Sequence, residues 1–261
     1  MTALAELIRA TQVSPGQVAL FYLGQAGFAF KTAAGKLLYL DPYLSDVANR
    51  LFGFKRMQPP VLDPEELQAD LILSTHAHVD HLDPEALAVA ARQPATHFVG
   101  ALDCAEPYRE LGLPPERYTL LARGQSVELA GVKLRATFAD HGDLAPDALG
   151  LVLDFGGVTV YNVGDTALTP EPLLASLGEV RPDVMIAPLN GAFGNLNEAE
   201  ACRLGALVKP RLLIGAHFWM FVEHGGDPAR FLREAEGLPA GTRAIIMAPG
   251  ERLIYPEEAG Q

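Results

Sequence analysis

Apolar residues along this chain gather into short runs separated by turn residues. The runs 18–24, 28–31 and 37–41 are rich in β-branched and aromatic residues and are bounded by glycines, which is typical of strands in a meander. The run 70–75 is almost continuously apolar, as expected of a strand that is buried on both faces. We predict further strands over residues 97–100, 118–121, 126–130, 132–138, 149–155, 158–163, 183–188, 211–216, 244–248 and 252–255.

Helical signals fall between the predicted strands. Asp83 suits an N-cap, and Pro84 suits the first turn of a helix that follows the run 70–75. Residues 43–60 carry no helical pattern and are predicted to be irregular, and Gly156-Gly157 between two apolar runs predicts a tight hairpin. We predict further helices at the N-terminus and near residues 101–112, 171–178, 197–208 and 228–236.

The order of these elements leaves two layered architectures open. Two groups of strands can form two sheets packed face to face, with the helices covering the outer faces. A single doubly wound sheet fits the periodicity equally well, so the pattern alone does not choose between them. No Ser/Gly-rich or charge-rich stretch is typical of a linker, and we therefore expect a single domain over residues 1–261.

The composition, 49 % hydrophobic and 20 % charged, is that of a globular protein with a large core. The net charge of −12 repels phosphodiester backbones and anionic lipid head groups, so we expect neither nucleic acid nor a membrane as a partner. A small anionic substrate is still compatible with this charge, because bound metal ions dominate the field inside a site.

The N-terminal residues do not have the pattern of an export signal. Glu6 and Arg9 interrupt the apolar residues there, no basic stretch precedes them, and no apolar run approaches the roughly 20 residues of a membrane span. Cys104 and Cys202 are far apart and stand in no metal-binding or redox spacing, which favours two small buried residues. We expect a cytoplasmic protein.

The candidate chemistry lies directly after the run 70–75, in the segment 76–81 (His-Ala-His-Val-Asp-His). His76 and His78 are two residues apart, so in an extended chain they project to the same side and can bind one ion. If the chain turns after them, Asp80 and His81 face a neighbouring position. Imidazole and carboxylate ligands together suit zinc, manganese or iron. The alternative is a histidine-rich surface loop, but a position after a buried strand holds ligands rigidly and favours a metal site.

The segment 76–81 resembles the HxHxDH signature of the metallo-β-lactamase superfamily. The resemblance covers nearly the whole chain and implies an α/β fold, the four-layer αββα sandwich with two mixed sheets packed face to face and helices outside. It also implies further ligands: His141 in FADHGD, Asp165 in YNVGDTAL as the residue that bridges two ions, and His217 in LLIGAHFW. Asp41 in YLDPYL is similar to the superfamily's early aspartate, which orients the ligands.

Each implied ligand also has an ordinary structural interpretation. His141 lies in a sequence suited to a tight polar turn, Asp165 in one suited to a cap before a helix, and His217 among apolar residues typical of a core. The signature upstream favours ligation for all three, and Asp165 has the further reason that two cations held close together need a bridging anion.

Within the superfamily, several stretches resemble the L-ascorbate-6-phosphate lactonase family. They are ALFYLGQAGFAFK, PPVLDPEEL before DLILSTHAHVDHLD, GLPPERYTLLARGQSVEL, and the region from NGAFGNLNEAEACRLG to HFWMF. This finer resemblance implies a small ester or lactone substrate carrying phosphate or carboxylate, such as a phosphorylated sugar lactone. It is also compatible with a homo-oligomer.

A basic cluster outside the signature is a candidate substrate contact. Arg50, Lys55 and Arg56 are interleaved with Phe52 and Phe54 in the segment predicted to be irregular. This composition suits a loop that covers the metal site and binds an anionic group, or else an ordinary solvated loop.

Three further polar residues have two interpretations each. Asn190 opens a loop that leads into a helix whose first amides can hold an anion, although a plain N-cap at Asn195 or Asn197 fits as well. His224 lies on a glycine-rich loop seven residues after His217, where it can bind substrate, donate a proton or have an ordinary loop role. His97 begins a strand away from any motif and is expected to be structural.

The candidate ligands together predict a hydrolytic mechanism. We expect two divalent ions per chain, Zn or Mn with Fe also compatible, bridged by Asp165 and held by two sets of residues: His76, His78 and His141 for one, Asp80, His81 and His217 for the other. Two cations lower the pKa of a shared water from ~15.7 toward ~7, so that a metal-bound hydroxide exists at neutral pH. Asp80 and Asp165 are therefore the predicted catalytic residues, with Asp80 chiefly a ligand that also handles a proton.

Three functions fit this chemistry. The first is a metal-dependent hydrolase that attacks a small ester or lactone. The second is a phosphodiesterase acting on small nucleotide or phospholipid-like diesters, and the third is a metal-stabilised binding protein without turnover. A full ligand set argues against the third, because structural metal sites are usually single and closed.

Overall fold

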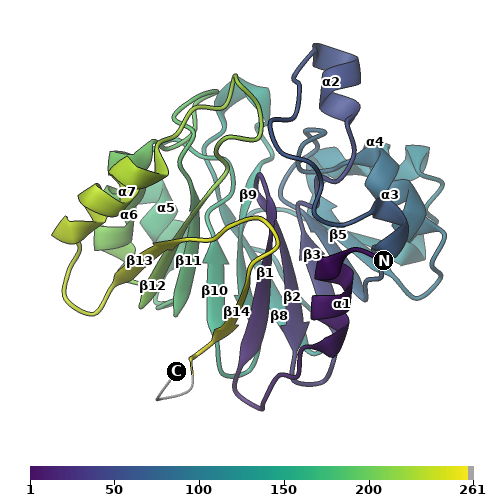
Figure 1. Cartoon of the computed structure of the whole chain (residues 1–261), viewed down its shortest axis with the longest axis horizontal. Coiled ribbons are helices and arrows are strands. Elements are labelled where there is room, and N and C mark those ends of the chain that lie inside the picture. Colours follow the sequence, from purple (N-terminus) through teal and green to yellow (C-terminus); the bar gives the residue numbers. More distant parts are fainter. Residues whose placement is uncertain (258–261) are drawn as a thin grey trace.

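Fourteen strands among residues 1–257, the part of the chain that this computed structural model describes, form two seven-stranded mixed sheets (Figure 1). The first sheet has the order β14 (Arg252–Tyr255), β1 (Val18–Gly24), β2 (Gly27–Thr32), β3 (Leu37–Leu40), β4 (Leu71–Ser74), β5 (His97–Ala101), β6 (Tyr118–Leu121). The second has the order β13 (Arg243–Ile246), β12 (Leu212–Ala216), β11 (Val184–Pro188), β10 (Thr159–Asn162), β9 (Leu149–Asp154), β8 (Val132–Phe138), β7 (Ser126–Leu129).

The two sheets share one pattern of strand directions. In the first, β1, β2 and β3 are antiparallel neighbours, and β3 to β6 are parallel. In the second, β7 to β10 are antiparallel neighbours, and β10 to β13 are parallel. As a result β1, β3 and β4 end at one edge of the first sheet, and β8, β10 and β12 end at one edge of the second.

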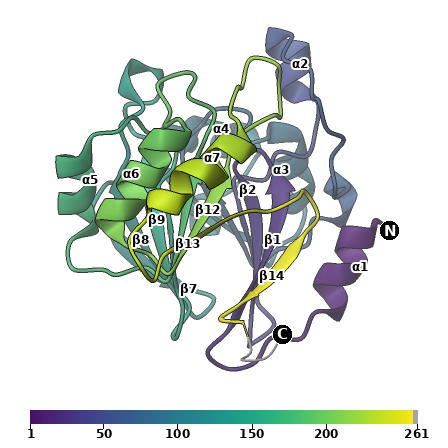
Figure 2. The ribbon, with the colours of Figure 1, turned by 60° about the vertical axis from the view of Figure 1, so that its left-hand side comes forward.

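Helices cover the outer face of each sheet, so the molecule has four layers (Figures 1 and 2). Helices α1 (Ala3–Ala10), α3 (Pro84–Ala91) and α4 (Ala105–Glu110) lie on the first sheet, and α5 (Pro170–Leu177), α6 (Glu198–Val208) and α7 (Pro228–Glu234) on the second. Alternation along β12 explains the packing: Leu212 and Ile214 point into the core between the sheets, whereas Leu213 packs under the helices with Phe231.

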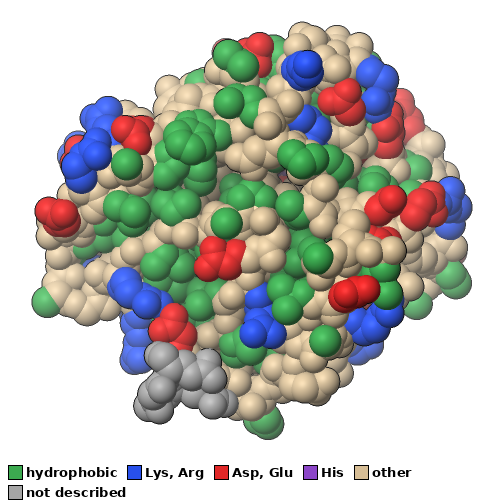
Figure 3. Space-filling model, in the orientation of Figure 1, with side chains coloured by type: hydrophobic (Ala, Val, Ile, Leu, Met, Phe, Trp, Pro, Cys, Tyr) green, Lys and Arg blue, Asp and Glu red, His purple; other side chains and the backbone are tan. Residues whose placement is uncertain are grey.

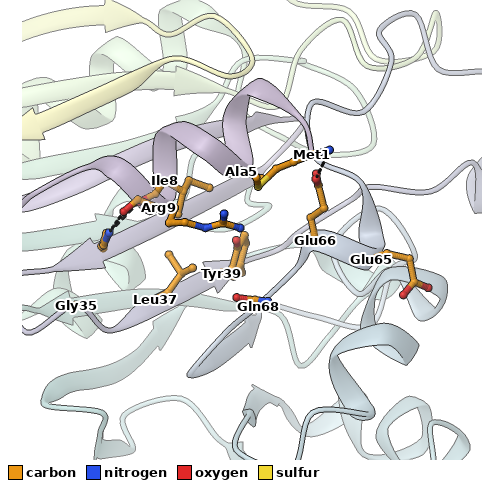
Figure 4. Close-up of a pocket in the computed structure, with 11 residues that line it drawn as sticks. Met1, Ala5, Ile8, Arg9, Gly35, Leu37, Tyr39, Glu65, Glu66 and Gln68 are labelled. Carbon is orange, nitrogen blue, oxygen red and sulfur yellow. Dashed lines mark hydrogen bonds and ion pairs between the residues drawn. The ribbon is translucent and has the colours of Figure 1, made fainter.

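Hydrogen bonds at one end of helix α1 and an ion pair at the other hold it on the first sheet (Figure 4). Lys31 Nζ on β2 donates to the carbonyl oxygens of Ile8 and Arg9, at 2.8 and 3.0 Å. At the other end, the amino group of Met1 lies 3.5 Å from Glu66 Oε1. The open cavity beside these contacts, about 300 Å³, shares no lining residue with the candidate metal ligands.

Each predicted strand is present, with ends that move by two residues or fewer, and the predicted hairpin at Gly156-Gly157 joins β9 to β10. The prediction for residues 43–60 was wrong, because they contain helix α2 (Val47–Phe52). The helix has six residues and no side-chain hydrogen bond at its Asp46 cap, and it ends at Gly53 with φ 77°. Contacts of Val47 and Ala48 with the chain near Phe221 hold it, and such contacts leave no periodic signal.

Among the described residues, no helix combines the length and the apolar character that crossing a bilayer requires.

Candidate metal centre

The candidate ligands follow four strands whose carboxyl ends share the two sheet edges. Residues 76–81 come after β4, His141 after β8, Asp165 after β10 and His217 after β12. His81 on the first sheet and His217 on the second bring the edges together, since their Nε2 atoms lie 3.2 Å apart. The cluster therefore spans the junction between the sheets, where open α/β sheets usually bind ligands.

His76, His78 and His141 form a first group, in which the ligand atoms all lie within 4.8 Å of one another. His76 Nε2 and His78 Nδ1 are 2.9 Å apart. His78 Nε2 lies 3.2 Å from the carbonyl oxygen of Leu144. Because a carbonyl only accepts, this contact places the proton of His78 on Nε2 and leaves Nδ1 free to bind a metal.

Asp80, His81 and His217 form a second group. Asp80 Oδ2 lies 3.7 Å from His81 Nε2 and 3.8 Å from His217 Nε2. Asp165 Oδ2 lies between the two groups, at 3.4 Å from His81 Nε2, 3.3 Å from His217 Nε2 and 3.9 Å from His141 Nε2. A carboxylate in that position is placed to bridge two ions.

Buried polar residues behind the cluster orient its rings. Asp41 Oδ2 accepts from His81 Nδ1 at 2.9 Å, which turns His81 Nε2 toward the other ligands. Asp41 also accepts from the backbone N–H and the hydroxyl of Thr75, and Thr75 Oγ1 lies 3.0 Å from His76 Nδ1. Asp41 therefore has the contacts of a residue that orients ligands.

The spacing of the ligand atoms fits bound cations. Donors about 2.1 Å from a tetrahedral ion lie roughly 3.4 Å from one another, and the contacts above range from 2.9 to 3.9 Å. The Nε2 atoms of His81 and His217 converge on each other and on the carboxylates of Asp165 and Asp80. A positive ion satisfies such converging lone pairs, and imidazole with carboxylate suits Zn, Mn or Fe.

Comparison with known proteins identifies the family of this chain. Residues 37–218 match the family described as a beta-lactamase superfamily domain. A UPF0173 metal-dependent hydrolase of Aeropyrum pernix is 32 % identical over 251 residues, which cover 90 % of this chain and 97 % of the relative. The chain belongs to the UPF0173 family of metal-dependent hydrolases.

Solved structures share the fold of this UPF0173 hydrolase. A metallo hydrolase of Ignicoccus hospitalis superimposes with a TM-score of 0.72 at 22 % identity, covering 93 % of this chain and all of the other. An isothiocyanate hydrolase from Delia radicum gut bacteria gives a TM-score of 0.71 at 21 % identity, covering 90 % of this chain and 98 % of the other. The metallo-β-lactamase fold expected from the signature is confirmed, and the doubly wound alternative is excluded.

Two further residues contact the second group of candidate ligands in this UPF0173 chain. His224 is buried, its ring stacks on that of His217 at 4.9 Å, and it forms a possible ligand trio with Asp80 and His217. Gln25, in the turn between β1 and β2, points its Nε2 at Asp80 Oδ2 at 2.7 Å and at His224 Nδ1 at 3.0 Å. The sequence interpretation missed Gln25, although its turn, Gly24-Gln25-Ala26-Gly27, is a signal for a specially held side chain.

Burial and the nearby carboxylates shift the pKa values of the clustered histidines in opposite directions. Burial lowers the pKa of His76 and His141 below the ordinary value, and burial together with His217 lowers the pKa of His224 to about 3. Burial alone would also lower the pKa of His81, but the charges of Asp165, Asp80 and Asp41 raise it well above the ordinary value. Neutral imidazole is the form that binds a metal, so the three lowered residues are ready to bind.

A cavity of about 660 Å³ opens over the cluster. His78, Asp80, His141, Asp165, His217 and His224 form its floor, and Asn195, whose Nδ2 donates to Asp165 Oδ2 at 2.7 Å, lies beside them. The metal centre is therefore accessible from one side, as a catalytic site requires.

The other polar candidates do not line this cavity. Arg50 pairs with Glu85, and Lys55 is exposed. Arg56 donates to the carbonyl oxygens of Tyr43, Ser45 and Gln58.

Asn190, Asn197 and His97 have local partners as well. Asn190 Nδ2 donates to Ala192 O, and Asn197 is the N-cap of α6. His97 Nε2 lies 2.9 Å from Thr119 Oγ1, between β5 and β6, which is a structural position.

Proposed function

We propose that the protein hydrolyses a small ester or lactone at two divalent cations. The observation that carries this proposal is the arrangement of two ligand groups around Asp165 at the floor of an accessible cavity. When bound, the cations supply an ionised water at neutral pH and a Lewis acid for the carbonyl oxygen. The lactone rests on the sequence stretches that resemble the L-ascorbate-6-phosphate lactonase family.

The side chains of the site bind the cations, transfer the proton and orient the carboxylates. The histidines of both groups, with Asp80 and Asp165, hold the cations in place. Asp80 is half-buried at the cavity floor, where its carboxylate can accept a proton from the attacking water and return it to the leaving oxygen. Asn195 holds Asp165 by its amide hydrogen bond, and Gln25 does the same for Asp80.

The alternatives receive less support. A phosphodiester would have only the metal ions as cationic partners, because the described residues that line the cavity include no lysine or arginine. On the face seen in Figure 3, basic side chains are scattered among acidic ones, and the chain carries a net charge of −12. A binding protein without turnover would favour a closed metal site, whereas this cluster faces a cavity.

The test is a panel of substrates with the protein loaded with Zn²⁺ or Mn²⁺. We expect turnover of 4-nitrophenyl esters or of γ- and δ-lactones, and loss of that turnover by at least ~10²-fold in Asp80→Asn and in His141→Ala. Cleavage of bis(4-nitrophenyl) phosphate without cleavage of any ester or lactone would replace the proposal with the phosphodiesterase. Metal content of each variant, measured in parallel, separates a lost ion from a lost reaction.

A further inference from the structure

We propose that the cavity over the metal centre binds an uncharged substrate with an apolar body, namely a medium-chain aliphatic or an aromatic ester or lactone. This inference rests on the proposed function for the reacting group and adds the chemistry of the group beside it. It departs from the phosphorylated or carboxylated substrate that the sequence resemblance implies.

One wall of the cavity is aromatic. Phe54 is its centre, with ring centroids 6.2 Å from Phe52, 6.0 Å from Phe193 and 5.8 Å from Phe221. These four rings come from the end of α2, the segment after it, and the loops that follow β11 and β12. The wall leads directly to the metal ligands, because Phe54, Phe193 and Phe221 all contact the ring of His224.

The rest of the cavity separates polar from apolar surface. Ala77, Val79 and Leu144 are the other apolar lining residues near the ligands. Polar groups are confined to the ligands of the floor and to Asn195. A molecule with one polar reacting group and an apolar body matches this division, and a volume of about 660 Å³ lies within the usual range for small-molecule sites.

Of the three basic residues nearest this wall in the sequence, Lys55 is exposed and does not line the cavity, and the other two are engaged elsewhere. The guanidinium of Arg56 stacks on the ring of Tyr43 at 4.5 Å and donates to backbone carbonyl oxygens. Arg50 pairs with Glu85 on α3. An anionic tail in the cavity would therefore lose its hydration without gaining a charged partner among the described lining residues.

Two aromatic residues of the wall are exposed to solvent, which is unfavourable for an apolar ring. Phe52 and Phe193 are 62 % and 45 % exposed, although burial of either ring would stabilise the fold. Phe193 also has φ 54°, a left-handed conformation that is unfavourable for a bulky residue. Strained and exposed apolar side chains beside a reactive cluster are typical of surfaces that a ligand covers.

Hydroxamic acids with different tails test this inference without requiring turnover. The hydroxamate head binds the metal ions in each case, while the tail changes from acetyl to butanoyl, hexanoyl and phenylacetyl. Succinic monohydroxamate provides an anionic tail of similar length to butanoyl. Kd for the metal-loaded protein is measured by calorimetry, and kcat/KM is measured for 4-nitrophenyl esters with the same tails.

We expect Kd to fall at least tenfold from acetyl to hexanoyl, since each buried methylene strengthens binding by up to about fourfold. The succinyl compound should bind more weakly than the butanoyl compound. Equal Kd values along the series, or tightest binding of the succinyl compound, would overturn the inference.

Variants test whether the aromatic wall causes the tighter binding of long apolar tails. Phe193→Ala should reduce the acetyl-to-hexanoyl ratio of Kd at least threefold. The matched control is Leu232→Ala on α7, since Leu232 is 44 % exposed and lies outside the cavity, and it should keep the wild-type ratio. An unchanged ratio in Phe193→Ala also counts against the inference.

The two readouts separate this inference from the proposed function. Tight hexanoyl binding without hydrolysis of any ester or lactone would keep the apolar cavity and reject the reaction. Hydrolysis of acetyl and hexanoyl esters with equal kcat/KM, together with equal Kd values, would keep the reaction and reject the apolar cavity.

Discussion

Gln25 shows how one amide can organise half of a metal centre. Its Nε2 lies within 3.3 Å of Asp80 Oδ2, His217 Nε2 and His224 Nδ1, yet an amide nitrogen carries only two hydrogens. Its Oε1 is buried and has no hydrogen-bond partner among the described residues. Gln25 also has φ 54°, so its side chain is directed into the cluster from an unfavourable backbone conformation.

We predict that Gln25→Ala weakens binding of the more loosely held metal ion by roughly ten- to a hundredfold, because residues behind metal ligands fix their orientation. Competition with a chromogenic chelator measures the affinity. Gln68→Ala, a change of the same type at an exposed position, is the control. Equal metal affinity in the two variants would rule out the role assigned to Gln25.

Arg56 is a second residue with several partners, and it holds the segment after α2 to Tyr43 and Ser45. Its planar guanidinium reaches three carbonyl oxygens and the face of Tyr43, which a lysine ammonium cannot do together. We predict that Arg56→Lys lowers the free energy of unfolding by ~1–3 kcal/mol in urea denaturation. Arg50→Lys, six residues earlier on an exposed ion pair, should change it by less than ~0.5 kcal/mol. Similar losses in both variants would contradict this account.

At the scale of elements, each ligand segment begins where a strand ends. The sequence predicts these strands from their apolar residues and the turns around them, and the resemblance to the metallo-β-lactamase superfamily identifies candidate ligands within three residues of the four strand ends, namely His76, His141, Asp165 and His217. Helix α2, the role of Gln25 and the aromatic wall could not be predicted from runs of apolar residues. Their positions depend on contacts between distant segments, such as the hydrogen bond from Met57 N to Met220 O at 2.7 Å.

Gly164, between β10 and Asp165, lies where the backbone passes very close to β9. Its φ is 70°, and a Cβ at this position would lie 2.3 Å from the carbonyl oxygen of Leu149 on β9. The turn is also held by Asn162 Oδ1, which accepts from Gly164 N at 2.7 Å. Only glycine allows β10 to pass this close to β9 and still deliver Asp165 to the cluster.

We predict that Gly164→Ala lowers the free energy of unfolding by ~3 kcal/mol or more and lowers metal affinity as well. Gly156→Ala is a matched control, because Gly156 has φ 78° with no atom near its Cβ position and should cost only about 1 kcal/mol. The difference between the two variants measures the clash separately from the backbone strain. Chemical denaturation that gives equal losses would show that Leu149 moves aside freely.

At the scale of the whole molecule, the cluster joins two halves of the chain. Backbone hydrogen bonds cross between the sheets beside it, from His217 N to Gln25 O at 2.8 Å and from Leu149 N to Thr75 O at 3.0 Å. Ligands from both sheets would be linked again by bound cations. Metal binding should therefore stabilise the packing of one sheet on the other as well as prepare the site for chemistry.

The last prediction concerns the metal-free protein as the pH falls. His76, His141 and His224 have a lowered pKa in the folded chain, so the unfolded chain binds more protons at these residues. The stability they contribute is present above about pH 6.5, the ordinary histidine value, and is lost as the pH falls below it. His81, whose pKa is raised, acts in the opposite direction, but its contribution changes only above about pH 6.5. Thermal unfolding after chelation should therefore give a Tm that falls as the pH is lowered from about 6.5 to 5. Metal-loaded protein should have a higher Tm than chelated protein at pH 8, and this difference should shrink toward pH 5, since protons compete with cations for the same nitrogens. A chelated protein whose Tm is constant or rises as the pH falls from 6.5 to 5 would show that the imidazoles of the cluster are not held neutral by the fold.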